Sequence, residues 1–185
     1  MLAYVFWHWR RPTAAAADYE AAQRRFHAAL SAAPSPGFVR SFSVAFEGAP
    51  WASHGGEAYE DWYLIDGSAA LDPLNAAAIS ASRQAPHDAA AALAAGGTAG
   101  LYSLRQGKPV VTPTVLTWFA KPASMSYREL FTMLEPLTGQ GEAALWCRQM
   151  TLGPALEFCL HSRDSVTLLP PLTPLALRCR AVWPG

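Results

Sequence analysis

Residues 2–9 read LAYVFWHW, a run of bulky side chains that is apolar on both alternating faces. This pattern is typical of a β-strand that is covered on both sides. The second half of the chain holds a similar run, because Val115-Leu116-Thr117-Trp118 aligns with Tyr4-Val5-Phe6-Trp7. We therefore expect each half to begin with a buried strand and to repeat one order of elements.

The segments after residue 9 alternate between helical and extended patterns. Tyr19, Phe26 and Leu30 recur at helical spacing, which predicts an amphipathic helix over 14–30 that ends before Pro34-Ser35-Pro36-Gly37. The other elements predicted in the first half are strands at 38–46 and 59–65, two short helices within 76–95, and a strand at 101–105. Their order is β-α-β-β-α-β.

The second half is predicted to follow the same order without its second helix. Pro170, Pro171 and Pro174 exclude a regular helix before the last strand. We expect one compact unit made of repeat 1 at 1–107, a connector at 108–113 and repeat 2 at 114–185. The elements predicted in the second repeat are strands at 114–120, 143–151, 156–161 and 175–183, and a helix at 126–137.

The β-α-β-β-α-β order is the ferredoxin-like pattern. Two joined copies resemble the dimeric α/β barrel superfamily in its fused, two-repeat form, with the resemblance carried by 2–30, 38–65 and 114–161. It implies an α+β fold in which two four-stranded antiparallel sheets pack into a barrel with helices outside. Members of the superfamily include cofactor-free monooxygenases of aromatic polyketides, haem-binding chlorite dismutase-like proteins and small-molecule degradation enzymes. No catalytic residue of these families matches a position in this chain, and fold alone does not select a function.

Composition excludes several classes of protein. Lys plus Arg equals Asp plus Glu at 14 each, so the chain lacks the positive field that binds nucleic acid. No stretch approaches the roughly 20 apolar residues that span a bilayer, and the N-terminal run lacks a cleavage site. Three widely spaced cysteines favour a reducing compartment, so we expect a cytoplasmic protein. A monomer or a homodimer is expected.

Aromatic residues are abundant and gather on the predicted strands. The chain has seven Trp, eight Phe and six Tyr. Aromatic walls are typical of small-molecule sites, and Trp7 and Trp118 are candidates for contact with an apolar or aromatic ligand. The alternative is that these side chains fill a solid core.

Two histidines are candidate catalytic residues. Alternation puts Glu157 and His161 on one face of a strand, where His161 would act as a base oriented by Glu157. His8 shares a face with Tyr4 and Phe6, and that face would line the barrel interior. The alternatives are a half-exposed strand with ordinary charges and a strand-end histidine bonded to backbone or solvent.

Arg178 and Arg180 lie on one face of the last predicted strand. Either could hold an anionic or enolate oxygen of a substrate. The cysteines show no metal-binding spacing, so neither a metal nor another cofactor is predicted. The favoured hypothesis is a small-molecule-binding protein or enzyme, acting by proton abstraction or monooxygenase-like oxygenation. The alternatives are a non-catalytic interaction module with a filled core and a haem protein using His161.

Overall fold

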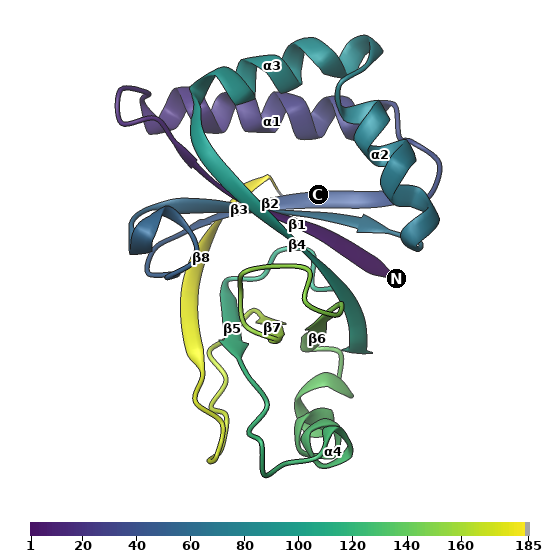
Figure 1. Cartoon of the computed structure of the whole chain (residues 1–185), viewed down its shortest axis with the longest axis vertical. Helices are drawn as coiled ribbons and strands as arrows, with labels where there is room; N and C mark the ends of the chain where they lie inside the picture. Colours follow the sequence, from purple (N-terminus) through teal and green to yellow (C-terminus); the bar gives the residue numbers. More distant parts are fainter. Residues whose placement is uncertain (184–185) are drawn as a thin grey trace.

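Eight antiparallel strands close into a barrel in the computed structural model, which describes residues 1–183 apart from the side chain of His54 (Figure 1). Around the barrel the order is β1-β3-β2-β8-β5-β7-β6-β4. The expected α+β class with an antiparallel barrel is confirmed. The strands are β1 Leu2–Arg10, β2 Phe38–Phe46, β3 Ala58–Ile65, β4 Ala94–Gly107, β5 Val115–Phe119, β6 Ala143–Arg148, β7 Phe158–Ser162 and β8 Leu175–Trp183.

Both halves of the barrel have the same order of neighbouring strands. The first half runs β4-β1-β3-β2 and the second runs β8-β5-β7-β6. Two seams join them: β2 pairs with β8, with Ala45 opposite Arg180, and β4 pairs with β6, with Ser103 opposite Cys147. This order fits two ferredoxin-like units, whose boundaries at 107 and 114 stay a prediction.

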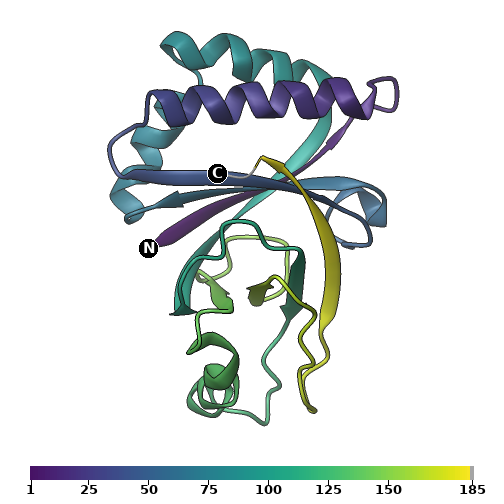
Figure 2. The same cartoon turned by 180° about the vertical axis from the view of Figure 1, so that it is seen from behind.

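The helices cover the outside of the barrel. Helices α1 (Ala16–Ala32), α2 (Leu71–Ala78) and α3 (Gln84–Leu93) lie over the first half, and α4 (Tyr127–Thr138) lies against the second. Figure 2 shows α1 running along the outer face of the first half. Residues 163–174, between β7 and β8, form no helix, in agreement with their prolines. Within residues 1–183 no helix is both long and apolar enough to cross a membrane.

Strand β4 is longer than expected. The sequence predicts that Gly96 and Gly97 end the preceding helix, yet both belong to β4, which starts at Ala94. The glycines are needed because aromatic side chains of β1 lie across them. A Cβ atom at Gly96 would stand 2.9 Å from the Trp9 ring, closer than packed carbon atoms approach. Strand β6 is shorter than expected and ends at Arg148.

Alternation along β1 separates two buried environments. Trp7 points into the barrel, where large side chains fill the interior and Trp7, Trp62, Trp118 and Trp146 are fully buried. Tyr4 and Phe6 point the other way, toward the helices of the first half. Both faces of β1 are therefore covered, as its continuous apolar run predicts.

Candidate functional site

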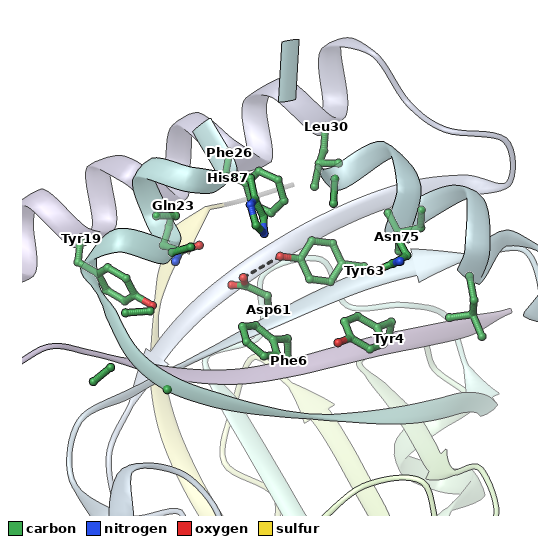
Figure 3. A pocket seen from close by; sticks show the side chains of 18 of the residues that line it. Tyr4, Phe6, Tyr19, Gln23, Phe26, Leu30, Asp61, Tyr63, Asn75 and His87 are labelled. Atoms are coloured by element: carbon green, nitrogen blue, oxygen red, sulfur yellow. Dashed lines mark hydrogen bonds between the residues drawn. The ribbon is translucent and has the colours of Figure 1, made fainter. Parts of the chain in front are cut away.

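A cavity of about 620 Å³ lies between the outer face of the first half and helices α1, α2 and α3 (Figure 3). Its lining is mostly apolar and contains neither Lys nor Arg among the residues described. Such a volume and lining suit a drug-sized, largely apolar molecule. The large apolar side chains that line it are Phe6, Phe26, Leu30, Leu71 and Leu74.

Three polar side chains form a connected chain beneath the wall of this cavity. Tyr19 and Asp61 both line the cavity, and His8 lies between them with 1% of its surface exposed. The Nδ1 atom of His8 is 2.6 Å from the Tyr19 hydroxyl, and its Nε2 atom is 3.1 Å from Asp61 Oδ2. The two ring nitrogens of His8 thus bridge Tyr19 and Asp61. When His8 is neutral with its proton on Nε2, facing the carboxylate, Nδ1 can accept the hydrogen bond of the Tyr19 hydroxyl.

Asp61 is the charged centre of the network. Tyr63 donates to its Oδ2 atom at 2.8 Å, and His27 Nε2 is 3.2 Å from its Oδ1 atom. Burial alone would raise the pKa of Asp61, but the charges and hydrogen bonds of His8 and His27 outweigh burial and hold this pKa well below its usual value. The carboxylate is therefore ionised, although it is fully enclosed.

The side chain of Tyr19 is a neutral phenol. Burial raises its pKa, and the negative charge of Asp61 raises it further. A hydrogen bond from Gln23, one helical turn along α1, opposes both effects. Tyr19 can accordingly give a proton to His8 only when it receives another in the same step.

The second half of the barrel shows what the same face looks like when it is only packed. There α4 places Leu130 and Leu134 on the outer sheet residues Phe119, Phe158 and Leu160, in an apolar cluster. A buried carboxylate costs free energy unless it is paired, so packing gives no reason for Asp61 on the first half. The polar network is thus a functional candidate.

No protein-family model matches the sequence, and no curated protein matches it. Two solved structures are similar to the chain. A candidate monooxygenase from Fusobacterium nucleatum subsp. nucleatum matches with a TM-score of 0.62 and 10% identity, over 88% of this chain and 76% of that one. A candidate monooxygenase from Lactobacillus acidophilus matches with a TM-score of 0.51 and 11% identity, over 88% and 77%. The chain has their fold.

His8 belongs to the site, although the expected environment was wrong. It shares a face with Tyr4 and Phe6, as predicted, but that face points toward the helices and not into the barrel. Because β1 is apolar on both alternating faces, the sequence does not show which face points into the barrel. Phe6 stacks on the His8 ring with centroids 5.3 Å apart and fixes its orientation.

His161 and Glu157 are not brought together. His161 is fully buried inside the barrel, where neither ring nitrogen has a hydrogen-bond partner among the described residues. Burial lowers its pKa to about 3. Glu157 instead accepts a hydrogen bond at 2.7 Å from Tyr127 on α4. Strand β7 begins only at Phe158, so alternation does not fix the side of Glu157.

Trp7 and Trp118 fill the barrel interior and do not line the cavity. Their rings lie 5.8 Å apart and are fully buried. Trp7 donates a hydrogen bond of 2.6 Å to Glu60, and Trp62 donates to the other carboxylate oxygen. These two side chains therefore belong to a filled core, which is the alternative stated from the sequence.

Arg178 and Arg180 do not reach the cavity. Both are exposed on β8, and Arg180 pairs with Glu20 of α1 through contacts of 2.6 and 3.2 Å. This pair lowers the pKa of Glu20, chiefly through the hydrogen bond. Neither arginine is placed to hold an oxyanion of a ligand in the cavity.

The histidines and cysteines of residues 1–183 form no group of three or more ligands suited to a metal ion. All three cysteines are free. His161 is enclosed by Trp62, Trp146 and Phe42, with the Trp62 ring centroid only 4.2 Å from its own. That enclosure leaves no open face for a haem iron.

Four residues of the site were not predicted: Tyr19, His27, Asp61 and Tyr63. The sequence does contain a signal for one of them, Asp61, because Glu60 and Asp61 are adjacent acids within the aromatic strand β3. Neighbouring residues of a strand point to opposite faces, so two acids in a buried strand place one carboxyl group on each side of the sheet.

Proposed function

We propose that the chain is a small-molecule enzyme of monooxygenase-like type, related to the fused dimeric α/β barrels, that binds an apolar aromatic substrate in the cavity beneath α1, α2 and α3. The observation that carries this proposal is the chain Tyr19–His8–Asp61, which starts at the wall of an apolar cavity. The fold shared with two candidate monooxygenases supports it at the level of architecture.

Proton abstraction follows from the order of the three groups. The Tyr19 oxygen accepts a proton from an acidic O–H or C–H group of the substrate while its own proton passes to Nδ1 of His8. The resulting imidazolium ion is stabilised by Asp61 at 3.1 Å. Enclosure in the protein strengthens that stabilisation, because little water screens the charges.

Oxygenation of such a substrate needs no separate reductant. If the substrate carries a CH₂ group between two aromatic rings, its anion can reduce dioxygen directly. The CH₂ carbon becomes a carbonyl by losing two hydrogen atoms and gaining one oxygen atom, and the second oxygen atom leaves as water with those hydrogens. The four electrons that reduce dioxygen all come from the substrate, so atoms and charge balance.

Substrate polarity follows from the lining. The cavity offers aromatic and aliphatic walls, two acidic side chains, the ionised Asp61 and Asp72, and no Lys or Arg among its described lining residues. A carboxylate or phosphate substrate would be repelled there, whereas a neutral phenol or cyclic ketone would not. We therefore propose neutral polycyclic compounds as the substrate class.

The test is oxygen uptake with a panel of neutral tricyclic phenols and ketones such as anthrone. Labelled dioxygen should supply the new carbonyl oxygen. Tyr19→Phe and His8→Gln should each lower kcat/KM by about a hundredfold or more. Tyr127→Phe is the matched control, because this tyrosine bonds Glu157 on the second half of the barrel.

Three results are informative. Uptake that depends on Tyr19 and His8 supports the enzyme. Tight binding without turnover overturns catalysis and favours a binding protein. Absence of binding across the panel overturns the ligand class together with the enzyme.

A further inference from the structure

Two histidines share the carboxylate of Asp61, one on each oxygen. His8 Nε2 lies 3.1 Å from Oδ2, and His27 Nε2 lies 3.2 Å from Oδ1. His8 contacts Tyr19 at the cavity wall, whereas His27 is connected to the wall through Asp61. His27 is fully buried, does not line the cavity, and places its Nδ1 atom 2.7 Å from the hydroxyl of Ser41.

Charge balance limits how many protons this trio holds. With both imidazoles neutral the buried cluster has a charge of −1, and with both protonated it has +1. One shared proton makes it neutral, which is the state that burial favours. The two histidines therefore compete for a single proton beside the Asp61 carboxylate.

The surroundings favour His27 as its holder. Ser41 can accept from a protonated His27, which would then donate from both ring nitrogens. The His27 ring also stacks on Tyr63 and Trp183 at 13° to each. The His8 ring stacks on Tyr59 and Phe6, and a tryptophan face attracts a cation more strongly than a phenylalanine face does. His8 faces the Tyr19 hydroxyl, whose proton is best accepted by a neutral ring.

Other charged groups near the trio are paired among themselves. Glu20 on α1 is bound by Arg180 of β8 and by the hydroxyl of Tyr59, so its charge is compensated. His87 of α3 contacts Asp88. The titratable groups that face the trio are Tyr19 from α1, Tyr59 and Tyr63 from β3, and Tyr4 from β1.

We propose that His27 is a positioning residue that holds the resting proton of the Asp61 cluster and so keeps His8 neutral as the acceptor of the Tyr19 proton. The inference rests on the proposed function for its catalytic meaning. The location of the proton is a property of the folded protein alone and is measurable without substrate.

The direct test is the nitrogen NMR spectrum of the two imidazole rings in the wild-type protein at pH 7. Ring nitrogen shifts distinguish an imidazolium ion from each neutral tautomer. We expect His27 to be the imidazolium and His8 to be neutral with its proton on Nε2. The reverse assignment, or two neutral rings, would overturn the proposal.

The variant His27→Gln removes the second base and keeps an amide N–H directed at Asp61. His8 should then take the proton and show at pH 7 the imidazolium nitrogen shifts that His27 shows in the wild type. His87→Gln should leave His8 neutral in the same spectrum, because the contact of His87 is with Asp88. A neutral His8 at pH 7 in a folded His27→Gln protein contradicts the inference.

Turnover gives a second readout that separates positioning from damage. In His27→Gln the acid limb of kcat/KM should shift to higher pH, with about a tenfold loss near neutral pH that is recovered at alkaline pH while KM stays constant. A loss that is uniform over pH would indicate a structural role only. If the wild-type protein oxidises no panel compound, the proposed function fails while the NMR result still decides where the proton resides.

Discussion

Trp7 donates a 2.6 Å hydrogen bond to Glu60, a carboxyl group that is wholly enclosed within the barrel. Trp62 donates to the second oxygen of the same group. Burial raises the pKa of Glu60 to about 8 in spite of these two donors. The barrel interior and the cavity beneath the helices thus hold adjacent residues of β3 in opposite states, with Glu60 protonated at neutral pH and Asp61 ionised.

Glu60 should make the protein less stable as pH rises. An unfolded glutamate loses its proton near pH 4.3, whereas the folded one keeps it to about pH 8. Between these values the folded state binds the extra proton, so stability falls with rising pH by at most about 1.4 kcal/mol per pH unit. Urea unfolding at pH 5, 6, 7 and 8 measures this slope.

Glu60→Gln is the matched variant for that measurement. Glutamine offers one oxygen to the two indoles and turns an amide N–H toward the other, which costs about 1–3 kcal/mol at pH 5. The variant lacks the titration, so the stability advantage of the wild type should shrink as pH rises and reverse before pH 8. A constant difference across this range would show that Glu60 does not titrate there.

His161 should act in the opposite direction. Its folded pKa of about 3 lies below the value near 6.5 of an unfolded histidine. The contribution of neutral His161 to the free energy of unfolding is complete above pH 6.5. It is lost as pH falls toward 3, because the unfolded state then binds the extra proton. His161→Phe should keep the contact with Trp62 and show greater stability than the wild type at pH 4. Its kcat/KM tests the catalytic role predicted for His161.

Removing the Asp61 charge should destabilise the protein at neutral pH. Asp61→Asn leaves two buried histidines without their anion, which is expected to cost about 3–5 kcal/mol in denaturant unfolding at pH 7. Since the folded pKa lies below that of an unfolded aspartate, near 3.9, this stabilisation is present above pH 3.9 and disappears as pH falls through the folded value. Asp72→Asn, at an exposed position of α2, should have little effect.

Filling the cavity should block a ligand and spare the fold. Ala90 lines the cavity from α3, whereas the neighbouring Ala89 is exposed and does not line it. Ala90→Leu should weaken binding of a neutral dye such as Nile red at least about tenfold by occupying its space. Ala89→Leu, measured by the same fluorescence titration, should bind as the wild type does. Equal affinities would place the dye outside this cavity.

The fold could be predicted from the sequence because its signals are local. The run LAYVFWHW, the helical spacing of Tyr19 and Phe26, and the prolines at 170–174 each report on a few neighbouring residues, and their order led to the antiparallel barrel. Gly96 and Gly97 were wrongly predicted to end a helix, because a loop and a crowded strand both favour glycine. Only the rings of β1 that cross them distinguish the two.

The site was harder to predict because it depends on which side of the sheet each residue faces. Both sides of β1 are buried, one by tryptophans and one by helices, so hydrophobicity does not tell the interior of the barrel from its exterior. His8 was consequently recognised as a candidate but assigned the wrong surroundings. Tyr19, Ser41 and Asp61 come from α1, β2 and β3, and their proximity follows from the register of the strands together with the packing of α1 on the sheet.

The β2–β8 and β4–β6 seams both join strands of one polypeptide. When a barrel is assembled from two identical subunits, each substitution appears twice, and a gain on one side is tied to its copy on the other. Here every position occurs once. One half can therefore keep a buried ion cluster and an open chamber while the other supplies a tightly packed support, and dilution does not separate the two.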